Sequence, residues 1–207
     1  MNYTLVALPE QAIGDELDNI RNLLYQGGFR YTNHPLRMTS HVTLTQLKIS
    51  SDPQALKSLF ASAINHQTTI LIDHFSLITQ EHTWIAKIPE WKAKYPQGAT
   101  WIAFLFKSFA LEQLAKKLMI RAQNLNLDES FAYTQGIAQL QGIPDEEIQL
   151  FDYLANHLNL CNYAYPQKSA EALSFISSQF KRKKLIFDRI AFFAEQEMIW
   201  ELPFQGS

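Results

Sequence analysis

Apolar and polar residues alternate along several segments of the chain, which predicts β-strands because successive strand side chains point to opposite faces. These segments cover residues 2–8, 41–49, 68–79, 82–88, 100–108, 157–165, 184–195 and 198–204, with 68–79 and 82–88 as a candidate hairpin. Apolar residues three and four positions apart predict helices over 15–28, 50–66, 110–125 and 169–180. Prolines and a glycine predict a loop over 89–98. The mixture predicts an α+β fold.

The pattern repeats along the chain. At an offset of 116 residues, HVTL (41–44) aligns with HLNL (157–160), Leu59-Phe60 with Phe175-Ile176, and QEHTW (80–84) with QEMIW (196–200). A one-residue slip aligns Ile72-Asp73 with Phe187-Asp188. We therefore predict a duplication of two halves, each ordered strand, helix, His-bearing strand, helix, strand, strand.

The duplication gives His41 a counterpart. In the strand 41–49, the period of two places His41, Thr43 and Thr45 on one face. Two similar halves that pack together are related by an approximate two-fold axis, so His41 and His157 are expected to face each other across a central cleft. Thr43 and Asn159 each follow their histidine by two positions.

Residues 144–158 allow a competing interpretation. Pro144, the acidic residues after it, and Ile148, Phe151, Leu154 and Leu158 have helical spacing. If that helix included His157, the pair of histidine strands would not form. We favour a helix that ends near Asn156, because HLNLCNYAY alternates and Pro166 follows.

Charge and composition exclude several classes of protein. A net charge of −2 argues against coating long stretches of nucleic acid, although it allows binding of one nucleotide or one RNA end. The single cysteine, Cys161, excludes an internal disulfide and a cysteine-rich zinc site. No apolar stretch is long enough for a membrane span, and no signal peptide is evident. We expect a cytoplasmic protein without membrane contact.

Two facing histidines predict acid–base chemistry. The ordinary pKa of histidine, near 6.5, lets one ring be neutral while the other is protonated. One imidazole can then take a proton from an attacking water or hydroxyl, while the other protonates the leaving oxygen, as displacement at phosphorus requires. Thr43 and Asn159 can donate hydrogen bonds to phosphate oxygens. This chemistry needs no metal and no cofactor.

These residues resemble the 2H phosphoesterase superfamily, which includes 2'-5' RNA ligase and cyclic phosphodiesterase proteins. That family has two His-x-Thr/Ser-x motifs on equivalent strands of a duplicated bilobal α+β fold. HVTL at 41–44 matches the motif fully, whereas HLNL at 157–160 has Asn159 where Thr or Ser is usual. The resemblance implies one bilobal domain over 1–207, with halves of roughly 1–95 and 96–207. An exchange of terminal segments between the lobes is left open.

The resemblance also implies a function. It predicts metal-independent hydrolysis of 2',3'-cyclic phosphate ends of RNA or nucleotides to a 2'-phosphate, with reversible 2'-5' RNA ligation as a further activity. His41 and His157 would be the catalytic acid–base pair, and Thr43 and Asn159 the phosphate-binding residues. The partners would be RNA ends or small cyclic nucleotides, and we expect a monomer.

Other residues have weaker functional interpretations. His66, His74 and His82 recur every eight residues but lack ordinary metal-site spacing, and His34 lies in a predicted turn. The basic run KRKK at 181–184 is either a solvated loop or a contact for RNA phosphates. A base could stack on Phe151, Tyr153, Tyr163 or Tyr165, although each is typical of core packing too.

Two alternatives to an enzyme remain open. Asn159 is compatible with a non-catalytic module that binds nucleotides or RNA ends, and nucleotide binding without turnover would identify it. The duplicated halves could instead serve only a partner interface. A cleft that binds no phosphate-bearing ligand would favour that interpretation.

Overall fold

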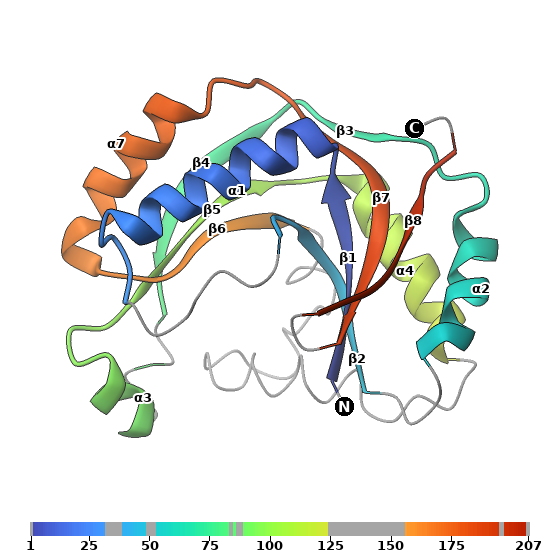
Figure 1. Cartoon of the computed structure of the whole chain (residues 1–207), viewed down its shortest axis with the longest axis horizontal. Helices are drawn as coiled ribbons and strands as arrows, with labels where there is room; N and C mark the ends of the chain where they lie inside the picture. Colours follow the sequence, from blue (N-terminus) through green and yellow to red (C-terminus); the bar gives the residue numbers. More distant parts are fainter. Residues whose placement is uncertain are drawn as a thin grey trace.

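The structure is a computed structural model that describes residues 2–31, 39–48, 53–82, 85, 89–123, 156–194 and 197–205. Within them the elements alternate in the predicted order (Figure 1). The first half contains β1 (Asn2–Pro9), α1 (Gln11–Gln26), β2 (Val42–Lys48), α2 (Pro53–Ile64), β3 (Ile70–Ile72) and β4 (Phe75–Glu81). After α3 (Pro89–Lys94), the second half contains β5 (Thr100–Phe106), α4 (Phe109–Gln123), β6 (His157–Ala164), the 3-10 turn η3 (Pro166–Lys168), α7 (Ser169–Gln179), β7 (Leu185–Ala194) and β8 (Glu197–Pro203).

The described strands form two sheets. Sheet A has the order β2-β1-β7-β3, and β8 pairs with β7 on the same edge as β3; sheet B has the order β4-β5-β6. All pairings are antiparallel. The expected α+β fold is confirmed, and each sheet combines strands from both halves of the sequence.

Helices cover one face of each sheet. Helices α1 and α7 pack on sheet B, while α2 and α4 pack on sheet A, as Figure 1 shows. Helix α1 follows β1 of sheet A but packs on sheet B, and α4 follows β5 of sheet B but packs on sheet A. The main hydrophobic core lies between the sheets and these helices, and includes Leu5, Leu17, Phe60, Phe104 and Phe187, each at most 3% exposed.

The halves are related by an approximate two-fold axis at β3 and β7. Ile70 pairs with Phe187, Leu71 with Ile186, and Ile72 with Leu185. In this part of the chain, residues 115 positions apart are equivalent. Ile70 therefore pairs with the counterpart of Ile72, and Ile72 pairs with the counterpart of Ile70. An antiparallel pair of equivalent segments has two-fold symmetry by its own geometry. The axis therefore passes near the Leu71–Ile186 pair.

Two sequence predictions need correction. The strand expected over 68–79 is divided into β3 and β4, because β3 pairs with β7 in sheet A and β4 pairs with β5 in sheet B. Residues 89–94 of the expected loop form α3, which is favoured by Pro89 at its start, Glu90 in the first turn and lysines in the last.

Other predictions fall partly outside the described residues. Of the strand expected over 82–88, only His82 and Ile85 are described, and neither belongs to a strand. Residues 144–155, where a helix that ends near Asn156 is expected, lie outside the described part of the chain, as do His34 and the candidate stacking residues Phe151 and Tyr153. No helix among the described residues combines the length and apolar character needed to cross a membrane.

Candidate functional site

The two histidines occupy equivalent positions at the starts of β2 and β6. His41 directly precedes β2, and His157 is the first residue of β6. A helix that continues through His157, the competing interpretation of this segment, is therefore wrong. Burial alternates identically over both motifs: the histidine is half-buried, the next residue buried, the third half-buried and the next two buried.

A one-residue bulge lies at the last residue of each motif. Leu5 pairs with Thr45 and Val6 with Thr43, which leaves Leu44 unpaired with β1. In sheet B, Ile102 pairs with Cys161 and Ala103 with Asn159, so Leu160 is skipped in the same way. Bulges re-aim side chains and are common beside functional sites.

The bulge corrects one sequence expectation. Thr45, expected on the face of His41 and Thr43, is only 2% exposed, because the alternation of faces shifts at Leu44.

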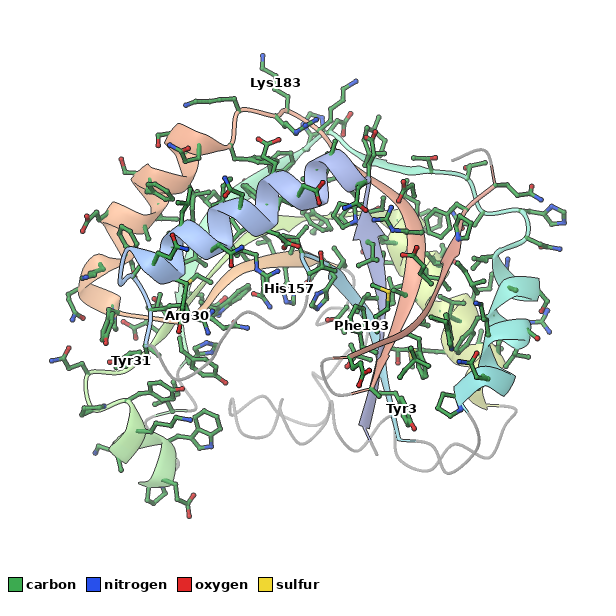
Figure 2. All side chains as sticks on the ribbon, viewed as in Figure 1. Tyr3, Arg30, Tyr31, His157, Lys183 and Phe193 are labelled. Atoms are coloured by element: carbon green, nitrogen blue, oxygen red, sulfur yellow. The ribbon has the colours of Figure 1, made fainter. Side chains whose placement is uncertain are left out.

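The structure brings the two motifs together. Strands β2 and β6 contact each other although they belong to different sheets. Burial is the main cause of the lowered pKa of His41, and proximity to His157 adds to it, so the two rings are close enough to interact electrostatically. Figure 2 shows His157 where sheet B meets the start of β2.

His41 is held by a network that begins on α1. Its Nδ1 lies 2.7 Å from the carbonyl oxygen of Thr39. Since a carbonyl can only accept, Nδ1 carries the proton and Nε2 keeps its lone pair. The Thr39 and Ser40 hydroxyls and the Ser40 N–H donate to the Asp18 carboxylate at 2.6–2.7 Å, and Arg21 donates to it at 2.8 Å. Asp18 thus fixes the segment that orients His41.

The charge of Asp18 is retained in this network. Burial raises the pKa of Asp18, but the hydrogen bonds from Thr39 and Ser40 and the charge of Arg21 outweigh burial. The pKa therefore lies below its ordinary value, and the carboxylate is ionised at neutral pH.

His157 also has its proton on Nδ1, but its hydrogen-bond partner differs from that of His41. Its Nδ1 lies 2.8 Å from Oδ1 of the neighbouring Asn156, which again places the proton on Nδ1 and leaves Nε2 free. The Asn156 carbonyl accepts from the Phe106 N–H at 2.9 Å, which ties the residue to β5. The Trp101 ring meets the His157 ring edge-on, with centroids 5.1 Å apart and planes inclined by 64°.

Both rings are neutral at pH 7 without a ligand. Burial lowers the pKa of His157 to about 4. Burial also lowers the pKa of His41 to about 4; the Thr39 hydrogen bond and the Asp18 charge act in the opposite direction, while Arg21 adds to the lowering. Each histidine therefore presents a neutral Nε2 as a proton acceptor.

Thr43 and Asn159 differ in how their polar atoms are placed. Both side chains are half-buried. Asn159 Oδ1 is buried and has no hydrogen-bond partner among the described residues. A buried polar atom without a hydrogen-bond partner lowers the stability of the fold by about 1–3 kcal/mol. Such atoms are therefore rare, and they typically mark a ligand site or a strained position.

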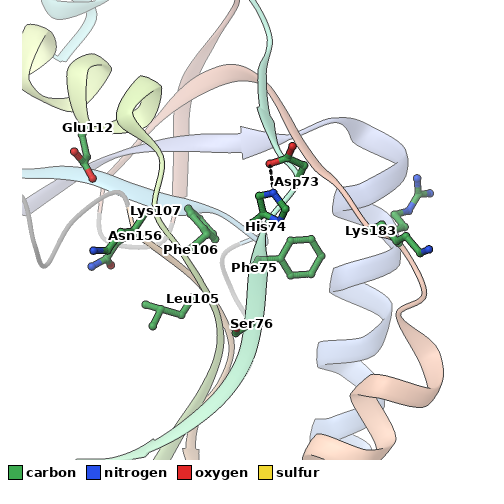
Figure 3. Close-up of a pocket in the computed structure, with 11 residues that line it drawn as sticks. Asp73, His74, Phe75, Ser76, Leu105, Phe106, Lys107, Glu112, Asn156 and Lys183 are labelled. Carbon is green, nitrogen blue, oxygen red and sulfur yellow. Dashed lines mark ion pairs between the residues drawn. The ribbon is translucent and has the colours of Figure 1, made fainter.

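A pocket adjoins the His157 side of the site. It has a volume of about 900 Å³ and lies where β5 ends and β4 begins (Figure 3). Ser76, Leu105 and Asn156 line it, together with the cations Lys107, Arg182 and Lys183 and the carboxylates Asp73 and Glu112. Asn156 therefore touches both the pocket and His157.

The other sequence candidates lie elsewhere. His66 and His74 are exposed, and His82 packs against Tyr163 with ring centroids 5.2 Å apart. Throughout the described ranges, no group of three or more His, Cys, Asp and Glu side chains is arranged to hold a metal ion. In the KRKK run, Lys181 donates to the Ser177 carbonyl at 2.7 Å and Arg182 pairs with Glu16. Cys161 is buried, and burial raises the pKa of its thiol to about 11, which suits no nucleophile.

Sequence reasoning missed three residues at the site. Asp18 and Asn156 orient the histidines, and Trp101 contacts one of them. Asn156 directly precedes a histidine, which is a local signal. Asp18 precedes His41 by more than twenty positions and Trp101 lies on another strand, so only their contacts reveal them.

The fold is similar to that of a solved structure, LigT of E. coli. Neither a protein-family model nor a curated protein sequence matches the chain. Among solved structures, LigT of E. coli complexed with 3'-AMP aligns over 99% of this chain and 98% of its own, with 12% identity and a TM-score of 0.51. A phosphoesterase (12% identity, TM-score 0.44) and Usb1 of Kluyveromyces marxianus (10% identity, TM-score 0.39) each align over 98% of this chain and 97% of their own. The chain therefore has the fold of LigT, as the resemblance seen in the sequence implied.

Proposed function

We propose that this protein is a metal-independent phosphoesterase that hydrolyses 2',3'-cyclic phosphate ends of RNA or nucleotides. The observation that carries the proposal is the matched pair of histidines, each of which donates from Nδ1 to a carbonyl oxygen and therefore has an unprotonated Nε2. The shared fold with LigT, solved as a complex with 3'-AMP, supports a nucleotide or an RNA end as the ligand. We expect the monomer to be sufficient.

The reaction requires one proton that the free site lacks. Both histidines are neutral at pH 7, because burial lowers the pKa of each to about 4. A phosphate anion between them stabilises the imidazolium form and raises the pKa of the ring that it contacts. The substrate thus arrives together with a proton, and the site then contains one acid and one base.

The displacement follows from that state. The neutral histidine takes a proton from water while the water oxygen bonds to phosphorus. The P–O3' bond breaks, and the protonated histidine gives its proton to O3', which leaves a 2'-phosphate. A 5'-hydroxyl in place of water would give a 2'-5' linkage by the same steps. Thr43 and the Asn159 amide donate to the non-bridging oxygens, where charge is held in the transition state.

A hydrolysis assay tests the proposal. The unaltered protein, His41→Ala and His157→Ala would be incubated with 2',3'-cyclic mononucleotides and a short RNA with a cyclic end, in EDTA. Loss of a general acid or base lowers the rate by about 10²- to 10⁴-fold, so both variants should lose nearly all turnover. His66→Ala, which removes an exposed histidine, is the matched control and should keep full activity. Turnover unchanged in either site variant, or abolished by EDTA, would contradict the proposal.

Proton uptake gives an independent test. Titration calorimetry with sulfate, a tetrahedral anion that does not itself titrate near neutral pH, in two buffers of different ionisation enthalpy should show uptake of up to one proton at pH 7. His41→Gln and His157→Gln should reduce that uptake. Binding with no proton exchange would show that the anion does not contact these rings.

A second candidate function rests on Asn159. Its buried Oδ1, which has no hydrogen-bond partner among the described residues, would repel a phosphate oxygen in the same position. A module that binds nucleotides or RNA ends without turnover fits that arrangement. Saturable binding of cyclic nucleotides without product, together with turnover gained in Asn159→Thr, would favour the binding module over the enzyme.

A further inference from the structure

The two histidine motifs have equivalent neighbours on the adjacent strands. The polar third residue of each motif pairs with Val6 on β1 in the first half and with Ala103 on β5 in the second. Val6 and Ala103 are therefore equivalent, as are Leu8 and Leu105, which lie two positions further along and share the face of the motif. Leu8 is 2% exposed, whereas Leu105 is 39% exposed. The face of each sheet that carries a histidine motif, here called its inner face, thus differs between the halves at this position.

A cavity lies at each of these two leucines, and the cavities differ in size. Leu8 and Thr39 line a cavity of about 150 Å³, whereas Leu105 and Asn156 line the pocket of about 900 Å³. Thr39 and Asn156 are the residues that accept from the two histidines. Pockets that hold small organic ligands measure about 300–1,000 Å³, so the pocket beside Leu105, here called the large pocket, has room for a nucleotide and the smaller cavity does not.

The smaller cavity has a cation whose charge is already balanced. Arg189 lines it. The guanidinium of Arg189 lies 3.0 Å from the Asp188 carboxylate and 3.3 Å from that of Glu201, and it donates to Gln11 at 3.1 Å. Three protein groups therefore occupy the donors of this arginine, which leaves little of its charge for a ligand.

The large pocket has two lysines without such partners. Lys107 directly follows β5, and Lys183 belongs to the basic run KRKK at 181–184. Both are exposed, and neither forms an ion pair with another residue that the structure describes. Arg182, from the same run, is paired with Glu16. The pocket therefore presents two ammonium groups that a phosphate can contact.

The remaining lining matches the other parts of a nucleotide. Asp73 and Glu112 can accept hydrogen bonds from ribose hydroxyls, and Phe75 and Leu105 provide apolar surface. The two carboxylates also offset the two lysines, so the pocket favours a nucleotide over an isolated anion. A few polar groups around apolar surface are the usual composition of a small-molecule site.

The large pocket begins at the second histidine. Leu105 pairs with His157 across β5 and β6, and Asn156 Oδ1 lies 2.8 Å from Nδ1 of that ring. Figure 3 shows Leu105 and Asn156 on one side of the pocket and Lys183 on the other. Successive nucleotides of a chain are joined through a single phosphate. A chain whose end lies at the histidines can therefore place its next nucleotide in the large pocket.

We propose that the large pocket binds the nucleotide next to an RNA end whose terminal phosphate lies between His41 and His157. This inference rests on the proposed function and deepens it, because that function leaves RNA and mononucleotides as equal ligands. A mononucleotide leaves the pocket empty, whereas a dinucleotide fills it and brings the internucleotide phosphate to Lys107 and Lys183. The preferred ligand is therefore an RNA chain of at least two nucleotides.

Long-range attraction is the alternative role of the two lysines. It would raise the affinity for every anionic ligand, and exposed lysines elsewhere on the surface would contribute equally. A direct contact in the pocket instead affects only ligands long enough to reach it. The two roles therefore differ in what they predict for a mononucleotide and for lysines outside the pocket.

Calorimetric titration of the full chain with 3'-AMP and with the dinucleotide ApAp, which has the same 3'-phosphate, separates these roles. The unaltered protein should bind ApAp more tightly than 3'-AMP. The double variant Lys107→Ala/Lys183→Ala should weaken ApAp by about 2- to 30-fold, the range for two exposed ion pairs, and change the affinity for 3'-AMP less than about twofold. The matched control, Lys117→Ala/Lys184→Ala, removes two exposed lysines that do not line the pocket and should change neither affinity.

Adenosine 3',5'-bisphosphate tests whether a whole nucleotide is recognised. It has a phosphate at the position of the internucleotide phosphate but lacks the second nucleoside. Its affinity should lie between those of 3'-AMP and ApAp. An affinity equal to that of ApAp would overturn the inference, because the second nucleoside would then contribute nothing.

The other outcomes separate this inference from the proposed function. Equal affinity of the unaltered protein for 3'-AMP and ApAp, equal losses for both ligands in the pocket variant, or a loss of the same size in the control would overturn the inference. Turnover of cyclic ends in that case would leave the phosphoesterase standing. Binding of ApAp that depends on the two pocket lysines, without turnover of a cyclic-ended RNA, would refute the phosphoesterase and support the pocket.

Discussion

The two histidine strands are alike in backbone and different in surroundings. Each carries a half-buried histidine, a polar residue two positions later and a bulge at the next position. Yet His41 is oriented through Asp18 on a distant helix, whereas His157 is oriented by its neighbour Asn156. The two halves thus share the strand geometry that orients the rings. They differ in the residues that hold the proton on Nδ1.

The inner surfaces beside the two strands differ more. Leu8 is buried and its counterpart Leu105 is exposed, and Thr4 stands where sheet B has Trp101. An approximate two-fold axis would make a symmetric site, but a nucleotide has a phosphate at one end and a base at the other. The difference in exposure between Leu8 and Leu105 is an asymmetry of this kind.

The largest expected effect separates the two faces. Leu8→Ser should lower the free energy of unfolding by about 2–5 kcal/mol, because it removes a buried side chain from a packed cluster. Leu105→Ser, the matched change at the exposed counterpart on sheet B, should lower it by less than about 1 kcal/mol. Urea denaturation of both variants measures the difference, and similar losses would show that the faces are equally packed.

A smaller effect separates the two positioning networks. Asp18→Ala leaves Ser40 and Arg21 without their carboxylate and should cost about 1.5–3 kcal/mol of stability. Asn156→Ala should cost about 1 kcal/mol, because it removes one side-chain hydrogen bond to His157. In the hydrolysis assay both should lower kcat more than they change KM.

The control for these variants is Asp15→Ala, whose carboxylate accepts from Gln11 at the exposed surface of α1 and should have almost no effect. If Asp18→Ala were as mild as Asp15→Ala, the network would not be what orients His41.

The pH dependence of stability tests the burial of the two rings. In the unfolded chain each histidine titrates near 6.5, whereas in the folded chain the pKa of each is about 4. The unfolded state therefore binds more protons between these values, and stability falls as the pH drops from about 6.5 to about 4. Each half-buried histidine should contribute on the order of 2 kcal/mol to this fall.

Urea midpoints at pH 7.5, 5.5 and 4.5 measure that slope. His41→Gln and His157→Gln should each flatten it, while His66→Gln, at an exposed position, should leave it unchanged. A slope that is the same in all three variants would place the titrating groups elsewhere.

The smallest expected effect comes from making the motifs alike. Asn159→Thr replaces a buried oxygen, unpartnered within the described part of the chain, with the hydroxyl found at Thr43. Stability should rise by up to about 1 kcal/mol, since the unpaired oxygen carries a cost and β-branched residues suit strands. Phosphate affinity, measured by calorimetry, should rise about twofold. Loss of phosphate affinity would show that the Asn159 amide makes a contact that threonine cannot replace.

Much of the fold was predictable because it is encoded locally. The alternation of HLNLCNYAY predicted β6, and the repeated His-x-x-Leu pattern predicted its partner in β2. The division of residues 68–79 into β3 and β4 was not predictable, because the residues read as one strand and only the partner strands assign them to different sheets. Helix α3 was missed because prolines and a glycine around six helical residues look like a loop.

By itself the sequence determined the order of elements, the duplication, the placement of His41 and His157 on equivalent strands, and the absence of a cysteine-based site, since periodicity and spacing are properties of the chain. The tertiary structure alone decided that Asp18 orients His41, that Trp101 meets His157, and that Leu8 is buried while its counterpart Leu105 is exposed. It also decided the protonation of the two rings, because the pKa of an imidazole depends on burial and neighbouring charges that packing brings together.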